Sequence, residues 1–298
     1  MRKIFFVALC SYCSIFSFGQ KTDKKLQENI EEAIRGFNGD IGIYVKNLRS
    51  GKTVSINADT IFPTASIVKV PILIGIMDKI QRGELAYDST LVYKDSLLYE
   101  GEDILGSFKN DEKILLKKVM MLMLTTSDNT ASLWLQSLAG KGTRINEILD
   151  SLGLVYTRVN SRTPGRENNR TQYGWGQTTS NEMGIIFEKI YRSEIFSAAA
   201  CDRMMRSLGR NYWDLNEAIS QIPPYIEVFS KNGCVNASRS EVLLVNAPHN
   251  PYIFCIFTKN NKDTQWTHAN EAWTMARKIS LMLWRYFEKK DKWEPPSK

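Results

Sequence analysis

A serine and a lysine stand three residues apart at the head of an apolar run, 62-FPTASIVKVPILIG-75. If a helix begins here, Ser66 and Lys69 share one face of it, because residues three apart are neighbours on a helix. The amine would then lie close enough to the hydroxyl to remove its proton, which is how a serine nucleophile is activated. An S-x-x-K pattern is expected by chance roughly once in a chain of this length, so the pair needs support from other residues.

Two further short motifs give that support. The sequence 127-SDN-129 follows the helical run KKVMMLMLTT, about 60 positions after Ser66, and would occur by chance in fewer than about one chain in ten. The sequence 230-SKNGCV-235 then places a lysine and a glycine at the end of a predicted strand. Each motif alone is a weak signal, and their order along one chain is a strong one.

The apolar spacing predicts strands near both ends of the chain and helices between them. A helix through Leu26 and Ile30 comes first, and an amphipathic helix with Trp273, Ala276, Leu283 and Phe287 on one side closes the chain. Alternating or continuous apolar runs predict strands over residues 41–48, 53–57, 225–230, 241–246 and 252–258.

This order predicts an α/β chain of the α+β type. Short links between strands favour an antiparallel sheet flanked by the N- and C-terminal helices, with an all-helical lobe inserted into it. Residues 20–61 and 210–298 would form the sheet lobe and residues 62–209 the helical lobe. Together they make one catalytic domain, with the site expected in the cleft between the lobes.

One long segment, residues 155–178, shows no periodicity, and loops of that length inside compact domains are usually functional or disordered. Its aromatic and arginine content favours order. The helix that follows should begin with a capping box formed by Thr179 and Glu182.

The N-terminus, MRKIFFVALCSYCSIFSFG, has two basic residues, an apolar stretch and small residues near its end. These features predict a signal peptide over residues 1–19, cleaved near Gly19, and therefore a secreted or periplasmic protein without stable membrane insertion. Cys201, Cys234 and Cys255 would remain. Because their number is odd, at least one stays a free thiol, and all three are expected to be buried.

Composition limits the classes of ligand and cofactor that the chain is expected to bind. The chain is 43% hydrophobic and 24% charged, with a net charge of +7 whose basic residues are scattered, so nucleic-acid binding is disfavoured. His249 and His268 stand apart without zinc or nucleophile-elbow motifs, so we expect neither a metal nor another cofactor. The charge distribution favours a small-molecule or peptide-like ligand that carries a carboxylate. We also expect a monomer.

The three motifs in this order resemble the penicillin-recognising serine enzymes, most closely the class A β-lactamases. The resemblance covers nearly the whole chain after the signal peptide. It implies an acyl-enzyme serine hydrolase, with Ser66 as nucleophile near the positive end of a helix dipole. Either Lys69 or a water held by a carboxylate would take its proton, and Ser127, held by Lys231, would pass a proton to the leaving nitrogen.

The resemblance also implies the residues that bind the substrate. The backbone N–H groups of Ser66 and Cys234 would form the oxyanion hole, beside Gly233. Asn129 would meet the substrate amide. In 237-ASRSEV-242, Arg239 would bind the substrate carboxylate.

The chain departs from the family pattern at two places. The family carries a deacylating glutamate before a proline, but in 157-TRVNSRTPGRENN-169 the residue before Pro164 is Thr163. Glu167 is the only acid nearby, and either serves as the base or forms a surface ion pair with Arg166 or Arg170. Asn232 also replaces the usual hydroxyl residue.

These departures leave three functions open. The leading one is class A β-lactamase-type hydrolysis of β-lactam amides. The alternatives are a D,D-peptidase or esterase of the same superfamily, and a β-lactam or muropeptide sensor that is acylated and does not turn over.

Overall fold

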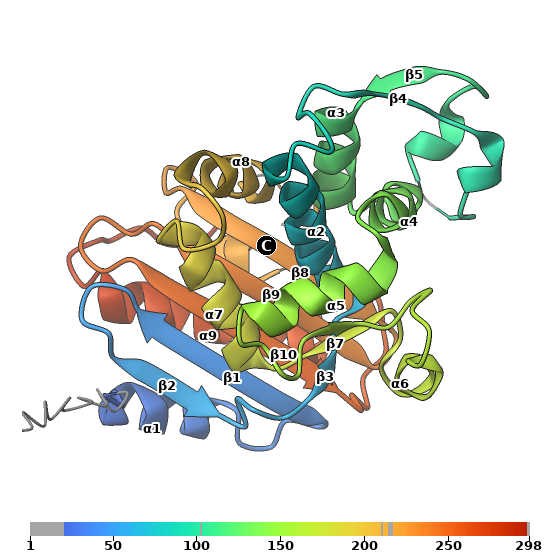
Figure 1. Cartoon of the computed structure of the whole chain (residues 1–298). Coiled ribbons are helices and arrows are strands. Elements are labelled where there is room, and N and C mark those ends of the chain that lie inside the picture. Colours follow the sequence, from blue (N-terminus) through green and yellow to red (C-terminus); the bar gives the residue numbers. More distant parts are fainter. Residues whose placement is uncertain (1–20, 102, 210, 214–216, 297–298) are drawn as a thin grey trace, which may run out of the picture.

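The computed structural model describes residues 21–101, 103–209, 211–213 and 217–296. The predicted signal peptide lies outside these residues. Figure 1 shows a twisted sheet with helices on both faces and a group of helices beside one edge. Within the described part of the chain, no helix is long and apolar enough to cross a membrane.

The central sheet has five antiparallel strands in the order β2-β1-β10-β9-β8. They are β1 (Asp40–Asn47), β2 (Thr53–Ile56), β8 (Val228–Val235), β9 (Ser238–Val245) and β10 (Tyr252–Lys259). The sequence predicts β8 over residues 225–230, but the strand begins later and continues through the Lys-Asn-Gly motif. Residues 223–226 form a turn in which the Ile226 N–H donates to the Pro223 carbonyl at 3.0 Å, so pairing with β9 begins only at Val228 and includes Lys231, opposite Val242.

Apolar side chains on the two faces of the sheet form two cores. On one face, strand residues such as Ile43 and Phe254 pack with α1 (Lys24–Ala33) and α9 (Glu271–Phe287). On the other, Tyr44 and Phe257 share a core with α7 (Ser180–Tyr191) and with the inserted segment. The predicted antiparallel sheet with flanking terminal helices is confirmed.

The inserted segment, residues 62–209, is mostly helical. Besides α7 it contains α2 (Lys69–Gln81), α3 (Leu116–Met121), α4 (Asn129–Leu138), α5 (Lys141–Ser151), α6 (Glu167–Tyr173) and α8 (Ala198–Leu208). It also contains five short strands that the sequence does not predict: β3 (Phe62–Pro63), β4 (Thr90–Val92), β5 (Lys113–Leu115), β6 (Arg158–Val159) and β7 (Gly176–Thr178). Strands of two or three residues are too short to produce a periodic pattern.

One buried carboxylate holds the start of the segment without periodicity. Thr179 caps α7 by accepting the backbone N–H of Glu182 at 3.1 Å. The Glu182 side chain accepts the backbone N–H groups of Val155, Tyr156 and Thr157, at 2.6, 2.9 and 2.6 Å. This glutamate therefore fixes the start of the loop.

Candidate active site

Ser66 lies in a 3₁₀ turn, η1 (Ala65–Val68), that runs directly into α2. Ala65 has φ +44°, in the left-handed region that residues with a side chain rarely adopt. Such strain persists only where the surroundings enforce it, and it clusters at functional sites. Here Thr64 is held by a backbone hydrogen bond to Gly176 of β7, at 3.0 Å.

Lys69, the first residue of α2, gathers the predicted catalytic side chains around its amine. Its Nζ lies 3.1 Å from Ser66 Oγ, 2.9 Å from Ser127 Oγ and 2.9 Å from Asn129 Oδ1, and it also donates to the carbonyl of Ser127. The residue is completely buried. Burial, with a smaller effect from Lys231, holds the pKa of Lys69 well below its usual value, although Asp103 and Asp128 oppose the shift.

Two carboxylates fix the Ser-Asp-Asn turn at the start of α4. Asp128 accepts the N–H groups of Ala131 at 2.7 Å and Leu105 at 2.9 Å. Asp103 accepts the backbone N–H of Asn129 at 2.9 Å and that of the next residue at 2.8 Å. Ser127 itself has φ +60°. No sequence pattern marks Asp103, because it lies in a loop and belongs to none of the three motifs.

β8 brings the third motif against the nucleophile. A Cβ on Gly233 would lie 2.3 Å from the carbonyl oxygen of Thr64 and 3.0 Å from the backbone nitrogen of Ser66. Only glycine permits this approach of the two backbones. Lys231 is completely buried, and its amine donates to the backbone and side-chain oxygens of Asn232, both at 2.9 Å.

The amide of Asn232 is also bound from the other side. Its Nδ2 donates to Glu217 Oε1 at 3.0 Å, and its Oδ1 accepts from Asn211 Nδ2 at 3.2 Å. Burial raises the pKa of the Glu217 carboxyl to about 7. Neither Glu217 nor Asn211 was singled out from the sequence, because no periodicity or motif marks them.

Arg239 is 3% exposed, and its contacts lie at the end of the sheet. The guanidinium donates to the carbonyls of Val235, Ser238 (3.0 Å) and Gln265 (3.2 Å). Its central carbon lies 4.1 Å from the ring centroid of Trp266 and 4.9 Å from that of Trp273. None of these partners belongs to the group around Lys69.

The loop presents no carboxylate at the position before Pro164. Thr163 is buried, and its hydroxyl donates to the carbonyl of Ser161 at 2.9 Å. Glu167 is exposed at the start of α6 and accepts the N–H of Gly165 at 3.1 Å. Arg166 binds Asn160 Oδ1 at 3.0 Å and Gln177 Oε1 at 2.8 Å.

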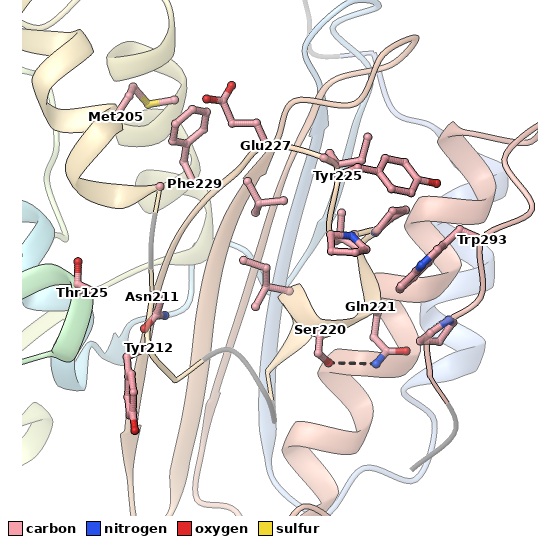
Figure 2. A pocket seen from close by; sticks show the side chains of 18 of the residues that line it. Thr125, Met205, Asn211, Tyr212, Ser220, Gln221, Tyr225, Glu227, Phe229 and Trp293 are labelled. Atoms are coloured by element: carbon pink, nitrogen blue, oxygen red, sulfur yellow. Dashed lines mark hydrogen bonds between the residues drawn. The ribbon is translucent and has the colours of Figure 1, made fainter.

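A groove of about 1310 Å³ runs beside the site, between α8, the start of β8 and the C-terminal segment. Figure 2 shows Thr125, Asn211 and Tyr212 near one end of the drawn group, and Tyr225 and Trp293 near the other. Ser66, Lys69 and Ser127 are outside the lining. Asn211 connects this groove with Asn232.

His249 has its contact outside this centre. His249 Nδ1 lies 2.6 Å from the Glu288 carboxylate, and the His249 side chain is 69% exposed. Cys201, Cys234 and Cys255 are free thiols, the first and last buried and Cys234 half-buried. Over the described ranges, no group of three or more His, Cys, Asp or Glu side chains is placed to hold a metal ion.

Comparison with known proteins gives a consistent result. The sequence model of the beta-lactamase enzyme family matches residues 25–287. Beta-lactamase VEB-1 of Pseudomonas aeruginosa is 22% identical, over 96% of this chain and 98% of that protein. The solved structure of PBP-A aligns with TM-score 0.79 and 22% identity, covering 91% of this chain and 98% of that one. The β-lactamase of Sphaerobacter thermophilus DSM 20745 aligns with TM-score 0.77 and 19% identity, covering 89% and 98%.

Proposed function

The chain belongs to the beta-lactamase enzyme family, and on that premise we propose that it hydrolyses β-lactam amides through an acyl-enzyme on Ser66. The observation that carries the proposal is the position of the buried Lys69 amine, 3.1 Å from Ser66 Oγ and 2.9 Å from Ser127 Oγ. It connects a nucleophile, a base and a second hydroxyl around one buried amine.

Acylation uses the lowered pKa of Lys69. In its neutral form the amine takes the Ser66 proton while Oγ bonds to the substrate carbonyl carbon. The backbone N–H groups of Ser66 and Cys234 donate hydrogen bonds to the carbonyl oxygen and stabilise its negative charge. Collapse breaks the carbon–nitrogen bond, and Ser127 gives its proton to the leaving nitrogen, regaining one from Lys69.

The substrate is a small or peptide-like molecule that carries a carboxylate. Lys231 attracts that carboxylate, Asn129 meets the substrate amide, and Asn232 and Gly233 line the floor. Arg239 adds positive potential from the end of the sheet. The protein acts as a monomer, secreted or periplasmic after removal of its signal peptide, and needs no cofactor.

Deacylation needs a water and a base. Glu167 takes this role from the start of α6, whose neighbouring strand β3 leads into the Ser66 turn. A second candidate function is a slowly deacylating peptidase or sensor. It is favoured by the buried hydroxyl of Thr163 where the family pattern has a glutamate.

Hydrolysis of a chromogenic cephalosporin tests the proposal. Sustained turnover that disappears in Ser66→Ala supports the β-lactamase. One burst equal to the enzyme concentration favours the sensor. If Ser66 is labelled by a fluorophosphonate and the cephalosporin is untouched, the enzyme is a peptidase or esterase.

A further inference from the structure

A buried carboxylate lies behind the strand that carries the Lys-Asn-Gly motif. Glu217 is 3% exposed, and its Oε1 lies 3.0 Å from Asn232 Nδ2 and 3.7 Å from Cys234 Sγ. The oxygen of the same side-chain amide, Asn232 Oδ1, accepts a hydrogen bond from the Lys231 ammonium at 2.9 Å. One amide therefore separates Glu217 from the lysine that attracts the substrate carboxylate, and the mechanism above gives this acid no task.

Charged groups face Glu217 from three elements. The titratable and charged side chains that act on it or stand beside it are Lys231 and Cys234 of β8, Arg239 and Glu241 of β9, and Arg277 of α9. Desolvation outweighs the nearby cations and raises the pKa of Glu217 to about 7. Its charge therefore changes within the ordinary working range of an enzyme.

We infer that Glu217 is a specificity-determining residue whose negative charge weakens the binding of a substrate carboxylate beside Lys231 and Asn232. The inference rests on the proposed function, in which Lys231 attracts that carboxylate. Two effects act together. The ionised Glu217 repels the ligand carboxylate, because the protein interior between them screens charge poorly. It also accepts a hydrogen bond from the Asn232 side-chain amide, which could otherwise donate to an oxygen of the ligand. A substrate with a neutral group in this place is not repelled.

The inference makes discrimination depend on pH. Below about 7 the carboxyl is protonated and the carboxylate substrate is accepted. Above it the acid is ionised, so the neutral substrate gains in relative terms. The ratio of the acylation rates with the carboxylate substrate and the neutral substrate isolates this effect. Lys69 acts in the same way on both substrates, so its titration changes both rates equally and leaves their ratio unchanged.

The test compares a chromogenic cephalosporin with its methyl ester. Acylation of Ser66 is followed by intact-protein mass spectrometry at about pH 5.5 and about pH 8.5, one to two units on either side of the Glu217 transition. In the wild type the acid-to-ester ratio should fall on the order of tenfold between the two values. In Glu217→Gln it should stay high at both. Glu227→Gln, which changes the same net charge at an exposed position, should behave as wild type.

A ratio that does not change with pH in the wild type overturns the inference, and this measurement needs no variant. An equal change for both substrates in Glu217→Gln overturns it as well, because the residue would then only orient Asn232. If neither substrate nor a fluorophosphonate labels Ser66, the proposed function fails and the inference falls with it. If both substrates label Ser66 and the acid-to-ester ratio does not change with pH, the inference fails and the proposed function stands.

Discussion

The amine of Lys69 lies 3.1 Å from the hydroxyl of Ser66, and both side chains come from the turn that opens α2. In the proposed function this contact pairs the nucleophile with its base. Burial holds the pKa of Lys69 well below its usual value, and Lys231 adds to the effect, which favours the neutral amine that the proposed acylation requires.

Lys69→Ala should therefore slow acylation by about 10² to 10⁴, the usual value of general-base help. The matched control is Lys79→Ala, because Lys79 lies farther along the same helix with a partly exposed side chain in a surface ion pair. Stopped-flow acylation of both variants measures the difference. Wild-type rates in Lys69→Ala would show that another group activates Ser66.

The same lowered pKa predicts the pH profile of acylation in the wild type. Since the neutral amine is the active form, the rate should rise as pH increases through the pKa of Lys69 and then level off. Pre-steady-state rates across the pH range give this curve. A rate that falls over the rising limb would identify a protonated catalyst instead.

Arg239→Ala should reduce stability more than it alters substrate preference. It removes contacts with two tryptophan rings and several backbone carbonyls of a buried guanidinium, a loss of roughly 2 to 4 kcal/mol. Thermal unfolding measures the loss, with Arg239→Lys as the charge-preserving control. A normal melting temperature combined with a raised KM for carboxylate substrates alone would instead assign Arg239 to direct recognition.

Glu217→Gln should stabilise the protein at high pH. Because the pKa of this acid is raised in the folded state, the ionised form is disfavoured there, and wild-type stability falls as pH rises from 4.5 to about 7. The difference reaches about 3 kcal/mol above that range and vanishes below 4.5. Melting temperatures at both ends of the range test this. An equal gain at acid and alkaline pH would contradict the burial of a titrating charge.

Glu167→Gln should leave acylation unchanged and slow deacylation by about 10² to 10⁴. Mass spectrometry would then show an adduct on Ser66 that persists in the variant and clears from the wild type. Glu194→Gln, at another exposed acid, is the control. Equal clearance in all three proteins would make Glu167 a surface residue, and persistence in the wild type would favour the sensor.

The sequence predicts the sheet, its flanking helices and the meeting of Ser66 with Lys69, because these depend on periodicity and local spacing. The family resemblance, which depends on the order of the three motifs, also assigns Ser127 and Asn129 to the same site. The sequence does not reveal Asp103 or Glu217, and it marks Glu182 only as part of a capping box and not as the acid that binds the start of the loop. Each is a single acid whose role depends on backbone or amide groups distant in sequence, and such partners leave no pattern along the chain.

The direction of Arg239 was equally beyond sequence reasoning. The motif comparison places the residue at the start of a strand, and β9 does begin there. Its guanidinium is then fixed by Trp266 and Trp273, which lie on either side of the start of α9. Whether Arg239 faces a ligand or the two tryptophan rings depends on how α9 packs on the sheet, and the sequence does not specify that packing.

The pairing of β1 with β10 has a consequence for how the protein is made. Ile43 lies opposite Ile256, so the middle of the sheet joins the first strand of the chain to its last. During synthesis β1 stays without this partner until almost the whole polypeptide has left the ribosome. Contacts of such long sequence separation form slowly. The chain should therefore remain unfolded, and open to chaperones or a secretion channel, until its C-terminal strands emerge.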